Sequence, residues 1–367
     1  MITINKPILG IEEEEAVIKS IRKGELTNAS YMGGANVKAA EEMLIKYLGV
    51  KHAIMVNSGT AALQASLMAL GVKPGDEVLL PSLTFAATAN AILTIGAHPI
   101  FVDISPEDFC IDPSDLIRKV TNKSKVVIPV HLYGYPAKMR ILLDLAVKKK
   151  LFVVEDAAQS LGATYEAKQT GTFGDLGCFS FYPSKVITSG EGGAVVTGND
   201  ELADRLRMVR NHGMSKDSSV KIFGMNLRLP ELSGAILCCQ MKKLDVFLKA
   251  RRKNAEILTK LLADVEGIVL PTEEENRKSN WYLYTVRIRK NRDKILESLH
   301  QAGVGAAVYY SLPIHLQPLY QKMGIAKLPE TEKASREVIS LPIHPAVCRD
   351  DLTLVASKLQ EALRTTS

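Results

Sequence analysis

The chain has 367 residues, 46% of them hydrophobic and 23% charged, which is the composition of an ordinary globular protein larger than one typical core. Its formal net charge of +6 is spread along the sequence, and the densest basic runs fall on expected helices, which argues against a nucleic-acid-binding surface. The five cysteines lack CxxC spacing and the seven histidines form no pair at metal-ligand spacing, so we expect reduced thiols, a cytoplasmic location and no metal site.

Two segments bear on membrane association. The amino terminus turns acidic where a signal peptide would carry its apolar core. The stretch between Glu77 and Asp103 contains no charge, yet prolines, a glycine and several hydroxyl side chains divide it into an expected strand, helix and strand. We therefore expect a soluble protein without a membrane partner.

Short apolar runs alternate with helical patterns across the first two-thirds of the chain. We expect strands at residues 52–56, 77–81 and 99–103, within the apolar run at 125–134, and at 151–156. Helical spacing lies between them at residues 60–71, 85–93 and 139–150. This alternation predicts an α/β fold with a mostly parallel central sheet and helices on both faces.

The pattern changes after about residue 230. A long helix is expected at roughly 241–265, followed by a strand at 283–289, a helix at 292–303 and a carboxy-terminal helix. We interpret residues 1–245 as a large ligand-binding domain and residues 246–367 as a smaller α+β domain.

Ligands of open parallel sheets bind beyond the carboxyl ends of the strands, and several suggestive groups follow such ends. After the strand "HAIMV" comes "NSGTAAL", where Gly59 permits close approach and the amides of Thr60 and Ala61 open a helix. A helix amino terminus of this kind binds phosphate. The alternative is that Ser58 or Thr60 is simply an N-cap.

Asp156 ends the strand "LFVVED", and Gln159 follows three residues later. A carboxylate at a strand end is suited to hold the nitrogen of a pyridine ring protonated, which maintains an electron sink. A helix cap is the alternative interpretation.

Lys185 follows the strand pattern "CFSFYP", in which Ser180 faces away from Phe179 and Phe181, toward the side of the expected ligand groups. Most lysines are solvated surface residues, and this is the alternative for Lys185. A partly desolvated lysine beside a ring can act as an amine nucleophile. The phosphate cradle, ring-nitrogen carboxylate and nucleophilic lysine together predict a pyridoxal phosphate site.

The sequence resembles fold-type-I pyridoxal phosphate enzymes, which share the aspartate aminotransferase fold, and among them the nucleotide-sugar aminotransferases of the DegT/DnrJ group. The resemblance is nearly full length. It includes "GGANVKAAEEMLIKYLGVKHAIMVNSGTAAL", "LPSLTFAATANAIL", "VVEDAAQSLGATY", "GTFGDLGCFSFYPSKVITSGEGGAVVT", "GMNLRLPELSGAI", "VYYSLPIHLQPLY" and "SLPIHPA".

By matching position, the resemblance implies that Lys185 forms the internal Schiff base and shuttles protons. It implies that Asp156 pairs with the pyridine nitrogen and that Gln159 contacts the ring hydroxyl. The residues it implies for the phosphate are Gly59, Thr60 and Ser180.

Four further residues carry implied roles. Phe85 would stack on the ring, although it could equally be a plain core aromatic. Asn226 matches a residue that reaches the phosphate of the neighbouring subunit, so the resemblance implies a homodimer with shared active sites. Tyr309 and His315 match a loop near the nucleotide sugar, and for His315 a structural role is the equal alternative.

The implied activity is a ping-pong aminotransferase that moves an amino group from L-glutamate to a keto group of a nucleotide-linked deoxysugar. Some relatives replace the lysine with histidine and dehydrate instead, so Lys185 favours transamination. "ITSGEGG" (residues 187–193) resembles the branch that aminates carbon 4 rather than carbon 3. The alternatives are an aminotransferase for a keto-cyclitol or another carbonyl compound, and a non-catalytic regulator that binds the cofactor.

Overall fold

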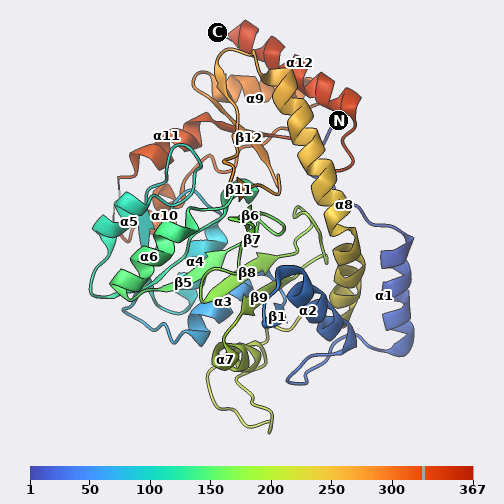
Figure 1. The fold of residues 1–367 in the computed structure, drawn as a ribbon, viewed down its shortest axis with the longest axis vertical. Helices are drawn as coiled ribbons and strands as arrows, with labels where there is room; N and C mark the ends of the chain where they lie inside the picture. The colour runs from blue at the N-terminus through green and yellow to red at the C-terminus, as the bar shows by residue number, and fades with distance from the viewer. Residues whose placement is uncertain (325–326, 367) are drawn as a thin grey trace.

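The computed structural model describes residues 1–324 and 327–366. Its centre is a seven-stranded sheet with the strand order β1-β9-β8-β5-β4-β2-β3 (Figure 1). The strands are β1 (His52–Val56), β2 (Glu77–Pro81), β3 (His98–Val102), β4 (Ser124–Val127), β5 (Phe152–Asp156), β8 (Leu176–Ser180) and β9 (Gly193–Thr197). The strands from β3 to β8 pair in parallel, whereas β9 is antiparallel to both β8 and β1. The predicted mostly parallel sheet is therefore confirmed.

Helices cover both faces of this sheet, as the buried runs of its strands require. They are α2 (Ala35–Leu48), α3 (Gly59–Ala69), α4 (Ala86–Thr94), α5 (Pro113–Lys119), α6 (Met139–Lys149), α7 (Asp200–Arg210) and α8 (Glu231–Leu262). The helix α1 (Ile11–Lys23) packs on α8 instead. Side chains alternate along β2: Val78 and Leu80 pack with α3, α4 and α7, whereas Leu79 packs with α5 and α6. In β1 the second face instead packs against α2 and α8, through Met55.

The helix α8 begins ten residues before its predicted start, so the expected range of 241–265 is wrong at its amino end. Its first part lacks a polar face because it packs against both α1 and α2. Gly234, which weakens a helical pattern in sequence, is needed at this contact. A Cβ there would lie 3.0 Å from the backbone nitrogen of Val37.

A second unit is built on a three-stranded antiparallel sheet in the order β10-β12-β13. Its elements are β10 (Ile268–Val269), β12 (Tyr284–Ile288), β13 (Val338–Leu341), α9 (Arg292–Gln301) and α12 (Arg349–Thr366). These strands and helices share a core with the carboxyl half of α8. The remaining short elements are β6 (Thr164–Tyr165), β7 (Lys168–Gln169), β11 (Arg277–Lys278), α10 (Pro318–Gln321) and α11 (Pro329–Glu337).

The predicted domain boundary at residue 245 falls inside α8, which runs without interruption from one unit to the other (Figure 1). The amino terminus lies with the second unit, because Ile2 bonds through its backbone to Gly303 and Gly305 at 2.9 and 2.7 Å. The division at residue 245 stays a prediction, and α8 and residues 1–5 connect the two units.

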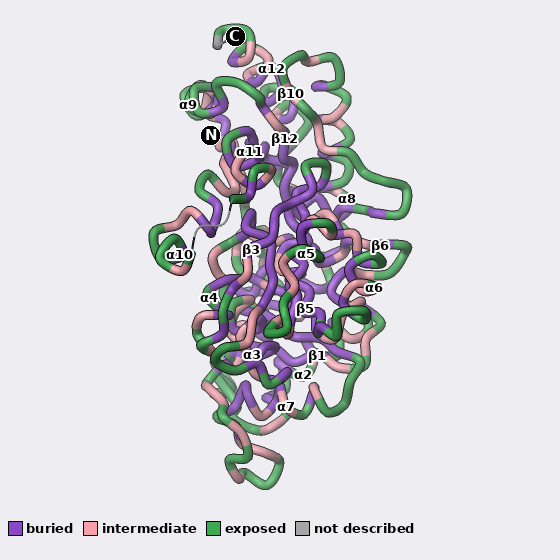
Figure 2. The backbone as a smooth tube through the Cα atoms, turned by 90° about the vertical axis from the view of Figure 1, so that its left-hand side faces the viewer, coloured by how far each residue is buried: buried purple, intermediate pink, exposed green. Residues whose placement is uncertain are grey.

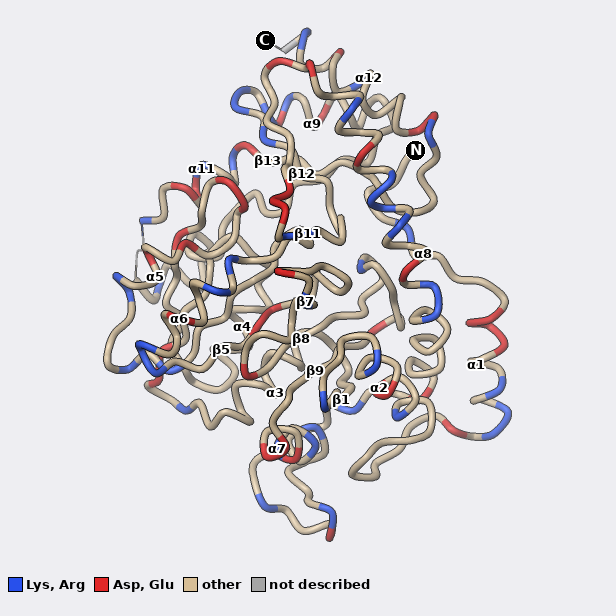
Figure 3. Tube along the Cα trace, viewed as in Figure 1, with Lys and Arg blue, Asp and Glu red and all other residues tan. Residues whose placement is uncertain are grey.

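The sheet is the most buried part of the molecule, and the exposed residues lie on the outer helices and loops (Figure 2). Lys and Arg are interspersed with Asp and Glu around this periphery (Figure 3). Among the described residues, none of the helices has the length and apolar composition that a membrane crossing requires.

Candidate active site

The carboxyl ends of β5 and β8 bring three of the predicted site residues to one cavity. Its lining includes Gln159, Ser180 and Lys185, together with Asn280 and Tyr282 from the segment that precedes β12. The two strands are parallel neighbours, so their carboxyl ends open at the same edge of the sheet.

The amino terminus of α3 meets the end of β8 beside this cavity. A Cβ on Gly59 would lie 2.8 Å from the Cβ of Ser180, so only glycine fits against the serine. The Ser58 hydroxyl accepts a hydrogen bond of 3.0 Å from the Ala61 amide, which confirms the N-cap alternative for Ser58. Thr60 is exposed in the first turn. The amino terminus of α3 thus brings the first backbone amides of a helix close to the Ser180 hydroxyl, and an anion site is built from such groups.

Asp156 is buried at the carboxyl end of β5. Its side chain accepts hydrogen bonds from the Thr88 hydroxyl at 2.9 Å and from the Ala158 amide at 3.2 Å. Burial raises the pKa of the Asp156 carboxyl, and these two donors and the nearby Lys185 charge oppose the rise. The predicted strand-end carboxylate is therefore buried, near a lysine, and held by donors on both oxygens.

Lys185 is half-buried in the loop after β8. Its Nζ lies 4.8 Å from the centroid of the Tyr282 ring, at a distance typical of a cation–π contact. The backbone amide of Lys185 donates to the Tyr182 carbonyl at 2.9 Å, which fixes the turn after the strand. Its amine therefore lies against an aromatic ring at a cavity, which favours the predicted site position over the surface alternative.

Gln159 connects the end of β5 to two tyrosines. Its Oε1 accepts from the Tyr133 amide at 2.7 Å and its Nε2 donates to the Tyr310 hydroxyl at 3.3 Å. Burial raises the pKa of Tyr310 well above its ordinary value, so this hydroxyl stays protonated at neutral pH. The amide of Gln159 is thereby oriented before any ligand binds.

Phe85 and Asn226 lie outside the cavity lining. Phe85 precedes α4, is 59% exposed, and lies 6.2 Å ring to ring from Tyr310, so the core alternative for Phe85 is wrong. Asn226 is exposed, and its carbonyl accepts from the Asn57 side chain at 3.5 Å.

Tyr309 and His315 follow α9 in sequence, and His315 lies in the short 3-10 helix Ile314–Leu316. The Tyr309 carbonyl accepts from the Tyr133 hydroxyl, and burial raises the pKa of the Tyr309 phenol. His315 is 2% exposed, and its ring contacts the Ser82 hydroxyl at 2.7 Å and a Glu332 oxygen at 3.5 Å. These contacts are those of the structural role that the sequence left open for His315.

The comparison with protein-family models decides the family. Residues 8–360 match the DegT/DnrJ/EryC1/StrS aminotransferase family. The chain belongs to this family.

Individual relatives agree with the family assignment. A pleiotropic regulatory protein of Geobacillus stearothermophilus is 38% identical over 370 residues, which cover 98% of this chain and 99% of that protein. A dTDP-3-amino-3,4,6-trideoxy-alpha-D-glucose transaminase of Streptomyces venezuelae is 38% identical over 339 residues, 92% of this chain and 89% of that protein. The crystal structure of S. venezuelae DesV with a ketimine intermediate matches with a TM-score of 0.91 and 35% identity, over 98% of each chain. The predicted family and the predicted fold class are therefore confirmed.

Sequence reasoning missed several residues that complete the site of this DegT/DnrJ/EryC1/StrS family member through a side chain or, for Tyr133, through the backbone amide. They are Thr88, Tyr133, Asn280, Tyr282 and Tyr310. Thr88 lies on α4 within an apolar helical pattern, where nothing distinguishes it from a helix-surface hydroxyl. The paired aromatic residues in "NWYLY" and "VYY" were the available signal for the tyrosines after residue 280.

Proposed function

We propose that the chain moves an amino group from L-glutamate to the 4-keto group of a nucleotide-linked deoxysugar, in two half-reactions of ping-pong order. Its membership in an aminotransferase family supports the reaction class. Nucleotide-sugar transaminases among the relatives support the substrate class. L-glutamate as the donor follows from the sequence resemblance.

The cofactor of the enzyme is pyridoxal 5'-phosphate, and the residues present fit it. The absence of a side chain on Gly59 leaves the amino terminus of α3 and the Ser180 hydroxyl close together, as a phosphate cradle needs. Asp156 offers a buried carboxylate to a pyridine nitrogen, and Lys185 offers an amine at the same edge of the sheet. The cofactor supplies an electron sink that stabilises negative charge on the substrate carbon.

The protein residues would supply binding, orientation and proton transfer. Gly59, Thr60 and Ser180 would bind the phosphate, and Asp156 would keep the ring nitrogen protonated. The Nζ of Lys185 would carry a proton from the α-carbon of the amino donor to the cofactor in the first half-reaction, and from the cofactor to the sugar carbon in the second. Gln159 would donate to the ring hydroxyl, since its oxygen is already occupied by the Tyr133 amide.

The observation that carries this proposal is the convergence of Lys185, buried Asp156 and the amino terminus of α3 at one edge of the sheet. An anion site alone, or a buried carboxylate alone, would fit many proteins. Together, the lysine, the carboxylate and the helix terminus match the aldehyde, the ring nitrogen and the phosphate of pyridoxal phosphate, respectively.

The proposal also includes a homodimer with shared active sites, in which Asn226 reaches the phosphate bound by the neighbouring subunit. Its support is the exposure of Asn226 and of large apolar side chains on one chain. Phe85 is 59% and Phe223 is 79% exposed, and Phe223 lines a surface groove with Met68 and Ile95. A second copy of the chain would cover such surfaces.

The first experiment is the visible spectrum of the protein loaded with pyridoxal phosphate, before and after L-glutamate. We expect a yellow band that glutamate bleaches, and no such band in Lys185→Ala. Lys249→Ala, which changes an exposed lysine on α8, is the matched control and should behave as wild type. A band whose absorbance does not change on addition of L-glutamate would contradict the proposed donor. The absence of a band in the wild type would contradict the proposed function.

A panel of keto sugars then tests the position of amination. A 4-keto nucleotide sugar should yield an amino product, and its 3-keto isomer should be turned over much more slowly. Preferential turnover of the 3-keto isomer would reject the carbon 4 assignment. A cofactor-loaded protein that transfers to neither isomer would favour the keto-cyclitol or regulatory alternatives.

A further inference from the structure

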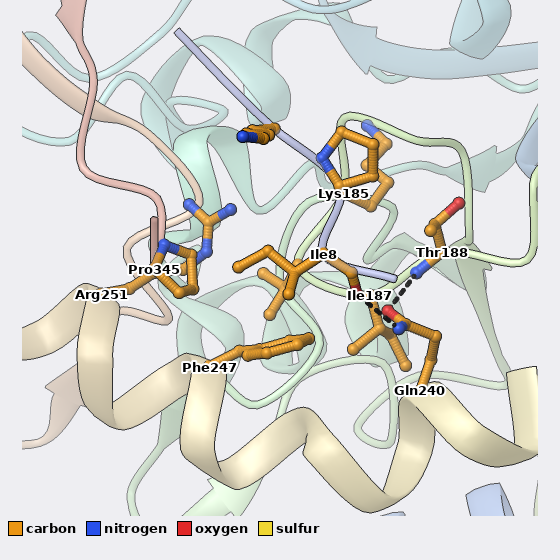
Figure 4. Close-up of a pocket in the computed structure, with 11 residues that line it drawn as sticks. Ile8, Lys185, Ile187, Thr188, Gln240, Phe247, Arg251 and Pro345 are labelled. Carbon is orange, nitrogen blue, oxygen red and sulfur yellow. Dashed lines mark hydrogen bonds between the residues drawn. The ribbon is translucent and has the colours of Figure 1, made fainter. Parts of the chain in front are cut away.

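A second cavity shares Lys185 with the one described above (Figure 4). Its lining comes from the amino-terminal segment, the loop after β8, the helix α8 and one residue of the second unit, Pro345. Figure 4 shows Phe247 and Arg251 rising from α8 toward Ile8 and Lys185. The cavity holds about one water molecule, so the side chains around it are close to van der Waals contact.

Arg251 is the unusual residue in this lining. It is 2% exposed, and within the described residues its guanidinium has no carboxylate at ion-pair distance. Burial lowers its pKa to about 10. Its Nε, among the described residues, has no hydrogen-bond partner. Burying a cation without a counter-ion is costly, so a packing role alone would be served better by an apolar side chain.

The three hydrogen bonds that Arg251 does make lead toward the lysine. Its Nη1 donates to the carbonyls of Trp281 and Tyr282 at 3.2 and 3.0 Å. Its Nη2 donates to the Asn5 side-chain oxygen at 3.0 Å. These acceptors belong to two separate segments of the chain, the amino-terminal residues and the residues that precede β12.

Both segments bond to the residue before the lysine. The Asn5 amide donates to the Ser184 carbonyl at 2.5 Å, and the Ser184 and Tyr282 hydroxyls are 3.1 Å apart. The Tyr282 ring in turn contacts the amine of Lys185. Arg251, Asn5, Ser184 and Tyr282 therefore form a closed ring of contacts, which meets the Lys185 amine at the Tyr282 ring.

The segment that carries Tyr282 is conformationally restrained. Trp281 has a φ of 54°, a left-handed conformation that is costly for a tryptophan and persists only where its surroundings impose it. Its amide donates to the Ser279 hydroxyl at 2.9 Å, and its carbonyl accepts from Arg251. The guanidinium thus fixes the backbone at the point from which the Tyr282 ring is presented.

We propose that Arg251 is a positioning residue for Lys185: through Tyr282, Asn5 and Ser184 it sets the place and direction of the lysine amine. The inference rests on the proposed function, because the amine matters through its bond to pyridoxal phosphate. This role gives a reason for the buried charge, since the planar guanidinium donates to three acceptors on two separate segments at once.

The test compares Arg251→Gln with Arg292→Gln. Arg292 is also buried in the second unit, and its Nη1 also donates to two backbone carbonyls, those of Ser335 and Val338 at 3.0 Å each. Both variants should lose thermal stability. Only Arg251→Gln should bind pyridoxal phosphate about tenfold more slowly, since a misdirected amine lengthens the approach to the aldehyde. Only this variant should reduce the visible circular dichroism of the bound cofactor per unit of absorbance.

Tyr282 supplies a second pair of variants that does not depend on Arg251→Gln being folded. Tyr282→Phe keeps the ring beneath the amine and should keep most of the circular dichroism, whereas Tyr282→Leu removes the ring and should lose it. Unchanged binding rate and circular dichroism in Arg251→Gln or Tyr282→Leu would overturn the positioning role while leaving the proposed function intact. A wild-type protein that gives no visible band with pyridoxal phosphate would overturn both.

Discussion

Asp156 is a buried carboxyl group whose protonation affects both binding and stability. Burial raises its pKa, so the folded cofactor-free chain holds the proton more tightly than the unfolded chain does. Stability contributed by such a group is present at pH values below the unfolded pKa and is lost as the pH rises. At neutral pH, therefore, the charged carboxylate destabilises the cofactor-free fold.

We predict that Asp156→Asn raises the melting temperature of the cofactor-free protein at pH 7 by a few degrees, because the amide removes the buried charge. The difference from wild type should shrink as the pH falls toward the raised pKa of the folded Asp156 carboxyl, and scanning calorimetry at several pH values measures it. The same variant should lose the glutamate-dependent bleaching. Asp144→Asn, at an exposed position on α6, is the control and should change neither property. Equal melting of Asp156→Asn and wild type at pH 7 would contradict the buried-charge argument.

Single residues divide into those whose role the sequence could indicate and those it could not. Asp156 and Lys185 each follow a recognisable strand end, so their place at the carboxyl edge was predictable. The contacts of Gln159 with Tyr133 and Tyr310 could not be predicted. Tyr310, for example, is 151 residues away along the chain. Exposure was also unpredictable for Phe85, whose apolar sequence neighbourhood resembles that of a core residue.

At the scale of elements, the site depends on how closely α3 approaches β8. A Cβ on Gly59 would lie 2.8 Å from the Cβ of Ser180, closer than real contacts permit, so one element must move. Overpacking of this kind costs about 1–3 kcal/mol. Gly59→Ala should therefore weaken the binding of pyridoxal phosphate by about tenfold, as measured by titrating the visible band.

Two further variants isolate the steric cause. Adding Ser180→Gly to Gly59→Ala removes the clash together with the hydroxyl, and it should recover part of the lost affinity. Gly198→Ala is the matched control, because nothing lies within 4 Å of the position that a Cβ would take there, and its affinity should equal that of wild type. If Gly59→Ala bound pyridoxal phosphate with wild-type affinity, the contact between α3 and β8 would be looser than the distances indicate.

The elements themselves were largely predictable from hydrophobic periodicity. The strands β1, β2 and β5 coincide with the expected ranges to within a residue. The start of α8 was wrong for a physical reason: its first turns pack on two helices, so they lack the polar face that marks a helix in sequence. The antiparallel direction of β9 could not be read from its composition, since pairing direction is set by the connections between strands.

At the scale of the whole molecule, α8 and the amino-terminal segment connect the two units. Residues 2–5 bond to the second unit through Ile2 and, through Asn5, to both Arg251 and the lysine loop. These contacts were not predictable from the sequence, because a short segment without a helix or strand pattern carries no pairing information. The lysine is consequently held by parts of the chain that are far apart in sequence.

The proposed dimer concerns the whole molecule, because it would build each active site from two chains. If Asn226 completes the neighbour's site, Lys185 and Asn226 of the same site come from different chains. A heterodimer of Lys185→Ala and Asn226→Ala chains then has one site with both changes and one intact site. Two chains with different affinity tags, co-expressed and purified in sequence on both tags, provide this heterodimer.

We predict that each homodimer loses most of its activity and that the heterodimer recovers about half of the wild-type activity, since one of its two sites is intact. The matched control is the heterodimer of Lys185→Ala and Asp156→Asn. These residues lie at the same chain's sheet edge, so each of its sites carries one change and no activity should return. If neither heterodimer recovered activity, Asn226 would act within the active site of its own chain. Chains that never co-purify would reject the dimer itself, and with it the proposed explanation for the exposure of Asn226 and Phe85 on one chain.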